Sequence, residues 1–401
     1  MNELLWGSQW PSQFSLLAAA ALMLICGALA VRVLSSTLRL PEVTAFILCG
    51  LFLGPSGVGL VSTETVSGLS ILADVALGLI LFDLGRHVDP VWLLRERWAL
   101  ITALTQTLTV FVGVALLLVN LGTEPLLAAM MASLVCAGSP VISFWVAQET
   151  KAEGQVTNRM LHAVALQCIF AVGIFALCFQ VLHVSQAADW KTALGHPIYL
   201  TVGSVVLGFV MSRIALFLSN LLQPRVALQQ LVVIGFIVIL VEANDLLRLS
   251  PLISLLVFGI GSRGYGKNAA LQPASSGVSR QLVFAFFLVY LGSTLVVDFR
   301  PELLLLGVGI FVLRWILLLL PSVLLSRKNG LSYKKGALLG TALVPLSGVS
   351  IVLVGHTTSF YPEFGVALDS RLATAVFVSS LVGPLLTWWS LRLAGEGRSD
   401  A

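Results

Sequence analysis

Charged side chains are scarce in this sequence. Only 10% of its 401 residues are Asp, Glu, Lys or Arg, whereas 58% are hydrophobic. A soluble domain is typically about a quarter charged. The scarcity of charge therefore excludes an ordinary soluble protein and predicts an all-α polytopic membrane protein.

Signals for several other functions are also missing. The formal net charge is only +4, and the basic residues are spread over many short loops, so the sequence offers no nucleic-acid-binding patch. Its five cysteines lie in apolar segments without a CxxC or Cys/His spacing, which predicts no disulfide, metal site or cofactor. No nucleophile or phosphate-binding loop stands out, and an enzyme is not expected.

Apolar runs predict thirteen membrane spans, most of them close to the roughly 20 residues that cross a bilayer. The spans are 14–35, 41–61, 66–85, 99–122, 125–148, 160–183, 197–220, 226–242, 251–262, 281–297, 302–326, 336–356 and 372–393. We expect a single transmembrane domain, residues 1–401, built from two six-span repeats. The first repeat covers 1–195, a linker helix 196–225, the second repeat 226–393 and a short tail 394–401.

The basic residues indicate how the chain is oriented. Loops after odd-numbered spans hold 18 of the 23 Lys and Arg residues, and the other loops hold four. By the positive-inside rule, this predicts an outside amino terminus and a cytoplasmic carboxyl terminus in the cell inner (plasma) membrane.

The predicted fifth and twelfth spans are each interrupted by small residues and a proline. They read SLVCAGSPVIS (133–143) and TALVPLSGVSI (341–351). Pro140 and Pro345 each remove a backbone donor, and Gly138 and Gly348 loosen the same turns. An ordinary proline kink would explain either break alone. Their matched positions in two repeats predict inverted repeats whose broken helices cross at mid-membrane, where secondary transporters bind substrate.

Three further stretches read LRLPEVTAFILCGLFLGPSGVGLV (38–61), LADVALGLILFDLGRHVDP (72–90) and ANDLLRLSPLISLLVFGI (243–260). They resemble helices of the monovalent cation:proton antiporter superfamily, especially the Kef-like, sodium-proton exchanger type of membrane domain. The resemblance implies a thirteen-span inverted-repeat fold in which a core domain moves against a dimerising gate domain. It also implies exchange of Na⁺ or K⁺ for protons.

The sixth span departs from that superfamily. Relatives carry there a pair of polar residues whose second member is the carboxylate that binds cation and proton in turn. This chain reads LQCIF, so Gln167 matches the first position and Cys168 replaces the carboxylate. A thiol with a reference pKa of about 8.5 is mostly neutral at pH 7 and is a poor ligand for a hard alkali cation.

The eleventh span keeps the basic partner, because Arg314 matches a Lys or Arg that relatives place beside the pair. An arginine inside a span costs about 2.5–3.5 kcal/mol on insertion scales and needs a partner or a cavity. Three interpretations remain open for Arg314: hydrogen bonds to the half-helix carbonyls of the twelfth span, a charge facing a transport cavity, or snorkelling to the interface.

Other polar residues are also candidates for the ion site. Asp74 lies in the third span, where the superfamily often has Glu, and is either a proton carrier or a structural acid. Ser139 and Ser347 lie beside the two breaks. They either ligate an ion through their hydroxyls or serve the tight helix contacts that small residues favour in membranes.

Three titratable residues lie near the ends of spans. Asp83 is expected to form a local ion pair with Arg86, one turn further on. Glu42 follows Pro41 at a helix start and suits stabilisation of the helix dipole. His162 lies near the cytoplasmic end of the sixth span and is either an ordinary interfacial histidine or a pH sensor.

Three functions remain open from the sequence. The first is a cation:proton antiporter that uses a displaced acid such as Asp74. The second is a passive or anion-tolerant pathway, because Arg314 without a carboxylate makes the crossing electropositive. The third is a transport-silent scaffold or sensor that signals to an unidentified protein partner. The expected partners are monovalent cations, protons, the lipid bilayer and a second copy of the chain, but no nucleic acid.

Overall fold

The computed structural model describes residues 15–38, 40–185, 190–222, 225–263, 278–295, 300–347 and 362–397. Within these ranges the chain forms sixteen helices and one isolated β-bridge. Seven of the helices are long and apolar enough to cross a membrane. The chain is thus an all-helical multi-pass membrane protein, as its composition predicts, whereas the count of thirteen spans and the inverted repeat stay predictions.

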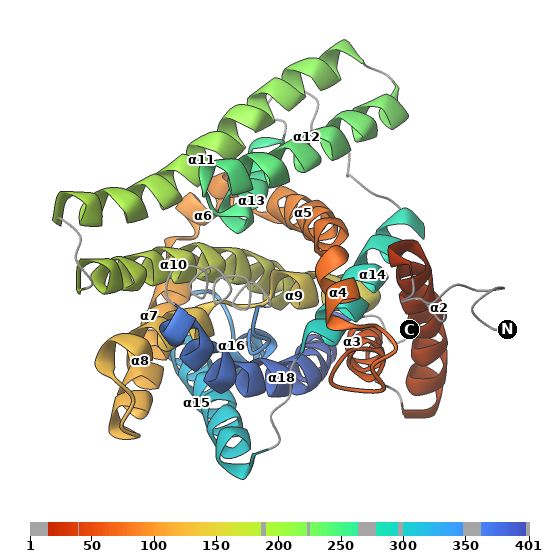
Figure 1. The fold of residues 1–401 in the computed structure, drawn as a ribbon. Helices are drawn as coiled ribbons and strands as arrows, with labels where there is room; N and C mark the ends of the chain where they lie inside the picture. The colour runs from red at the N-terminus through yellow and green to blue at the C-terminus, as the bar shows by residue number, and fades with distance from the viewer. Residues whose placement is uncertain are drawn as a thin grey trace, which may run out of the picture.

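The described helices pack as two bundles (Figure 1). The first bundle contains α2 (Leu16–Leu38), α3 (Glu42–Leu53), α5 (Ser70–His87), α11 (Trp190–Leu221), α12 (Val226–Leu247), α13 (Pro251–Gly261) and α14 (Val278–Thr294). The second contains α7 (Arg97–Asn120), α8 (Pro125–Cys136), α10 (Gln155–Ser185), α15 (Pro301–Leu324), α16 (Tyr333–Ala342) and α18 (Pro362–Leu393). The helix α9 (Pro140–Glu149) lies between them, in contact with α10 and α18 on one side and with α3 and α5 on the other. The short helices α4 (Thr63–Gly68) and α6 (Pro90–Arg95) join neighbouring elements.

Glycine lets two helices of the first bundle approach to backbone contact. A Cβ atom on Gly50 of α3 would collide with the carbonyl of Val289 on α14, and one on Gly292 would collide with the carbonyl of Ile47. Small residues at such contacts replace the hydrophobic driving force that a lipid environment does not supply. The first bundle therefore depends on close backbone packing between α3 and α14.

Several helix boundaries differ from the predicted spans. The helix α10 begins five residues before the predicted 160, because residues 155–159 continue the helix into the polar region where Glu396 caps it. The predicted third span instead forms α4 and α5, separated at Leu69. Hydropathy detects the apolar part of a helix but does not detect the polar turns that extend it.

Ion pairs and hydrogen bonds gather five segments at one end of the molecule, called the basic end below. Arg159 donates to the carbonyl of Asn329 (2.6 Å) and pairs with Glu96 (3.6 Å). Arg263 pairs with Asp89 (3.3 Å). The segments are 86–97, 150–159, 262–263, 326–335 and 392–397. All five belong to the loops and helix ends that the basic-residue pattern assigns to the cytoplasm.

The last described segment is anchored at the basic end by one carboxylate. Glu396 accepts hydrogen bonds from the backbone amides of Val156 (3.0 Å) and Thr157 (2.8 Å), at the start of α10. It also accepts from the Thr157 hydroxyl and from Lys335 Nζ (3.2 Å), which lies in the first turn of α16. An anion is favoured at a helix N-terminus by the free amides and the helix dipole. Glu396 therefore joins the start of α10 to the start of α16.

We predict that Glu396→Gln lowers stability in a pH-dependent way. Burial raises the pKa of Glu396, but the hydrogen bonds from Val156, Thr157 and Lys335 outweigh it, so the folded pKa lies below the ordinary 4.5. A carboxyl with a lowered folded pKa contributes stability above its unfolded pKa and loses it as pH falls through the folded value. Thermal unfolding in detergent should show a deficit of about 1.5–3 kcal/mol at pH 7 that shrinks below about pH 4.5. Glu153→Gln, an exposed acid of the neighbouring loop, is the matched control, and an equal deficit at both pH values would contradict this role.

Candidate functional site

The centre of the candidate site is the break between α8 and α9. The helix α8 ends at Cys136, Ala137 and Ser139 are extended, and α9 begins at Pro140, where the missing backbone donor costs nothing. The Ser139 hydroxyl caps the new helix by accepting from the amide of Ile142 (3.3 Å). Proline and serine thus end one half-helix and start the next within three residues.

The extended segment after α16 lies antiparallel to this break. Gly138 and Leu346 form the isolated β-bridge. The amide of Ser139 donates to the carbonyl of Pro345 (2.9 Å), and the amide of Ser347 donates to the carbonyl of Ala137 (3.2 Å). Backbone groups freed by the breaks therefore satisfy one another, as buried polar groups in a membrane must. Gly348 lies outside the described residues.

Arg314 lies fully buried against this crossing and binds the carboxyl ends of both half-helices. Its Nε donates to the carbonyl of Val344 (3.1 Å) and its Nη2 to that of Leu343 (3.2 Å), just after α16. Its Nη1 donates to the carbonyl of Val135, in the last turn of α8. Among the described residues no carboxylate pairs with Arg314. The negative ends of two helix dipoles take that place.

The sixth-span pair lies at the same crossing. The Cys168 thiol donates to the carbonyl of Gly138 (3.1 Å), and a Cβ atom on Gly138 would lie 2.7 Å from Gln167 Oε1. Gln167 Nε2 donates to Gln106 Oε1 (3.1 Å), while Gln167 Oε1 is buried and has no hydrogen-bond partner among the described residues. The structure thus brings Gln167, Cys168 and Arg314 to the break. The Gln167 amide oxygen is the acceptor there that has no described donor.

Helix α18 forms hydrogen bonds with the segment 342–346 at the crossing. The Ser379 hydroxyl accepts from the amide of Leu346 (2.8 Å), and the Thr387 hydroxyl donates to the carbonyl of Ala342 (3.0 Å). Both side chains are buried. Sequence reasoning missed these two residues because hydroxyl residues are common in membrane helices for packing alone.

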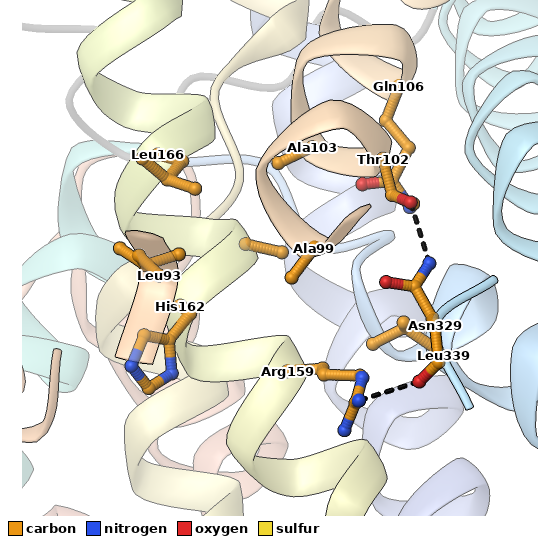
Figure 2. A pocket seen from close by; sticks show the side chains of 11 residues that line it. Leu93, Ala99, Thr102, Ala103, Gln106, Arg159, His162, Leu166, Asn329 and Leu339 are labelled. Atoms are coloured by element: carbon orange, nitrogen blue, oxygen red, sulfur yellow. Dashed lines mark hydrogen bonds between the residues drawn. The ribbon is translucent and has the colours of Figure 1, made fainter. Parts of the chain in front are cut away.

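Gln106 is the other residue that sequence reasoning missed. It is fully buried on α7, where it donates to the Ser322 hydroxyl (2.6 Å) and accepts from Gln167. The sequence signal for Gln106 is a polar amide inside the apolar run 99–122, where polar residues are rare. Gln106 also lines a small cavity near the basic end (Figure 2). Its bond from Gln167 connects that cavity to the crossing.

Two acids of the third span lie away from the crossing. Asp74 is in the second turn of α5 and is exposed. It interacts electrostatically with Asp245, near the end of α12, and with Tyr290 on α14. Asp83 is buried and forms an ion pair with Arg280 on α14 (3.6 Å). The sequence predicted a local pair with Arg86 and did not predict this partner from another helix.

Discontinuous helices that meet inside a two-bundle membrane protein are typical of secondary transporters. The sequence profile described as "Sodium/hydrogen exchanger, transmembrane" matches residues 20–391. The chain therefore belongs to the sodium/hydrogen exchanger family, a family of membrane transporters and not of enzymes.

Solved structures show the same fold. The structure of the sodium proton antiporter MjNhaP1 from Methanocaldococcus jannaschii at pH 8 matches with a TM-score of 0.65 at 16% identity, covering 94% of this chain and 95% of that one. An electron-microscopy structure of the same antiporter gives a TM-score of 0.68 at 16% identity, with coverage of 96% and 99%. No curated protein sequence matches the chain.

We predict that Arg314→Leu strongly destabilises the protein. The leucine removes the guanidinium donors from the buried carbonyls of Val135, Leu343 and Val344, at a cost of about 1–3 kcal/mol each. Arg314→Lys keeps the charge but loses the planar fork, so it should fall between leucine and wild type. Thermal unfolding midpoints in detergent measure this order. Arg213→Leu, at an exposed arginine of α11, is the control. An Arg314→Leu protein as stable as that control would show that the three Arg314 bonds do not clamp the half-helix ends together.

Proposed function

We propose that this chain exchanges a monovalent cation, Na⁺ or K⁺, for protons across the cell inner membrane. The observation that carries the proposal is the crossing of extended segments between half-helices, clamped by Arg314, in a member of the sodium/hydrogen exchanger family. Its predicted orientation puts the basic end and the carboxyl terminus in the cytoplasm. The division into two repeats and a linker helix belongs to the same proposal.

Coupling needs a group that binds and releases a proton, and the crossing has no carboxylate among the described residues. The Cys168 thiol donates a hydrogen bond to the backbone carbonyl of Gly138 and offers no negative charge for a cation. Of the two acids within the third span, Asp83 is committed to Arg280, whereas Asp74 is exposed. Asp74 is therefore our candidate for the displaced proton carrier.

The first test is proton movement in liposomes with a pre-set pH gradient, on addition of Na⁺, K⁺ or Li⁺. Wild type should dissipate the gradient, and Asp74→Asn should abolish this because an amide cannot carry the proton. Glu242→Gln, which removes another exposed acid of the first bundle, should leave the rate unchanged. Undiminished exchange by Asp74→Asn would eliminate Asp74 as the carrier.

The second test restores the missing acid. Cys168→Asp introduces a carboxylate at the crossing that Arg314 also contacts. If the chain lost only its coupling acid, Cys168→Asp should create or strengthen cation-dependent proton movement. Cys168→Asn, of the same size but without charge, should not. Equal rates for the two variants would show that position 168 plays no part in coupling.

One observation favours a second function, a transport-silent scaffold or sensor that acts through a protein partner. Every nitrogen of the Arg314 guanidinium already donates to a helix carbonyl, as a purely structural clamp requires. A passive or anion-tolerant pathway is the third candidate, since the described crossing carries one positive charge. Wild-type liposomes that move no proton with any alkali cation would favour the scaffold, and anion-dependent flux would favour the third.

We further propose that the chain forms a homodimer, as the resemblance to the antiporters implies. The outer face of α2 is apolar and exposed, with Leu17, Ile25 and Val33 each more than half accessible. Such a face suits either lipid or a second copy. A monodisperse monomer in both mild detergent and nanodiscs would contradict the dimer.

A further inference from the structure

A hydrogen bond between the two bundles depends on a histidine at the basic end. His162 lies on α10, five residues before Gln167, and only 2% of its surface is exposed. Its Nε2 lies 2.9 Å from the backbone amide of Asp89, at the corner between α5 and α6. Its Nδ1 lies 2.7 Å from the carbonyl of Asn158 on its own helix.

These two contacts fix the protonation state of the imidazole. A carbonyl can only accept, so Nδ1 must carry the hydrogen that it donates to Asn158. A backbone amide can only donate, so Nε2 must be bare to accept from Asp89. Both contacts are made only by the neutral ring with its proton on Nδ1.

The other partner of this bond is held by the first bundle. Arg263, just after α13, donates to the carbonyl of Arg86 (2.8 Å) and pairs with the Asp89 carboxylate (3.3 Å). The same carboxylate caps α6 by accepting from the amides of Val91 (2.9 Å) and Trp92 (3.1 Å). The bond from Asp89 to His162 therefore ties a corner fixed to α13 onto α10.

The surroundings single out His162 as the titrating member of this contact. Burial raises the pKa of Asp89, but its hydrogen bonds and Arg263 outweigh it, so Asp89 stays ionised down to below pH 3.8. The charged or titratable neighbours are His87 on α5, Asp89 at the corner, Arg263 after α13, and Arg159 on α10 itself with its partner Glu96. Unperturbed histidine changes its charge near pH 6.5, and the only other histidine in this group is His87.

We infer that His162 is a proton-binding site whose occupation unfastens the α5–α6 corner from α10. A proton added to the Nε2 lone pair turns the acceptor into a donor that faces the donor N–H of Asp89, and the bond is lost. The Nδ1 bond to Asn158 persists. Because α10 also carries Gln167 and Cys168, acidification at the basic end would loosen the helix that holds the sixth-span pair. The inference does not depend on which acid couples transport.

Leu93, Ala99 and Leu166 line the cavity beside His162 (Figure 2). The Trp92 ring packs against the imidazole, with centroids 4.4 Å apart. His162 is almost fully buried, so the loss of its bond should be visible as faster exchange of the Asp89 amide.

Hydrogen exchange of the Asp89 amide tests the inference in the full chain in nanodiscs, without any need for transport. We compare peptides that contain residues 88–92 at about pH 4.5 and about pH 7.5, with labelling times corrected for the intrinsic pH dependence of exchange. Wild type should lose about tenfold in protection at the lower pH, the effect of one hydrogen bond. Equal protection at both pH values would overturn the inference.

Three variants make the result specific. His162→Gln can present its Oε1 in place of Nε2 but cannot titrate, so protection should be high at both pH values. His162→Phe keeps a ring against Trp92 but offers no acceptor, so protection should be low at both. His87→Gln removes the neighbouring histidine, which bonds the Asp83 carbonyl within α5, and should keep the wild-type pH response. A pH response that survives in His162→Phe or disappears in His87→Gln would assign the effect to another group.

Discussion

One buried guanidinium holds the crossing of this protein together. Two half-helices end close to each other inside the second bundle, and the carbonyls at their carboxyl ends have no intrahelical partners. Arg314 supplies donors to both ends, with a geometry that a single flexible ammonium would not reproduce. The antiparallel bridge between Gly138 and Leu346, and the support from α18, can form only when these ends are brought together.

The charge balance of the crossing is set by Arg314, which pairs with no carboxylate among the described residues. A carboxylate beside the guanidinium would leave the site near neutral and allow a cation or a proton to compete for it. Here Cys168 offers a thiol instead, and among the described residues only helix dipoles oppose the positive charge, more weakly than a full anion would. The amide oxygen of Gln167 has no donor among the described residues. A neutral acceptor of this kind suits water, or a weakly held cation, better than a proton that must be carried.

The sequence predicts some of these features well and others poorly, for physical reasons. Apolar length and the prolines at 140 and 345 reveal the helices and the breaks, because both are local properties of the chain. Gln167, Cys168 and Arg314 were found through resemblance to a family, and their shared crossing depends on that fold. Gln106, Ser379 and Thr387 were missed because their role exists only across helix contacts. The pairing of Asp83 with Arg280 was beyond reach for the same reason, since the two residues lie almost 200 positions apart.

The anchoring of α10 by Glu396 bears on the order in which the protein is built. A ribosome makes the start of α10 well before the carboxylate that caps its first turn, because Val156 and Glu396 are 240 residues apart. Until then the amides of Val156 and Thr157 must rely on water at the membrane surface. The start of α10 can therefore be capped at the basic end only after Glu396 has been made and has reached it, so this contact forms after the helix itself.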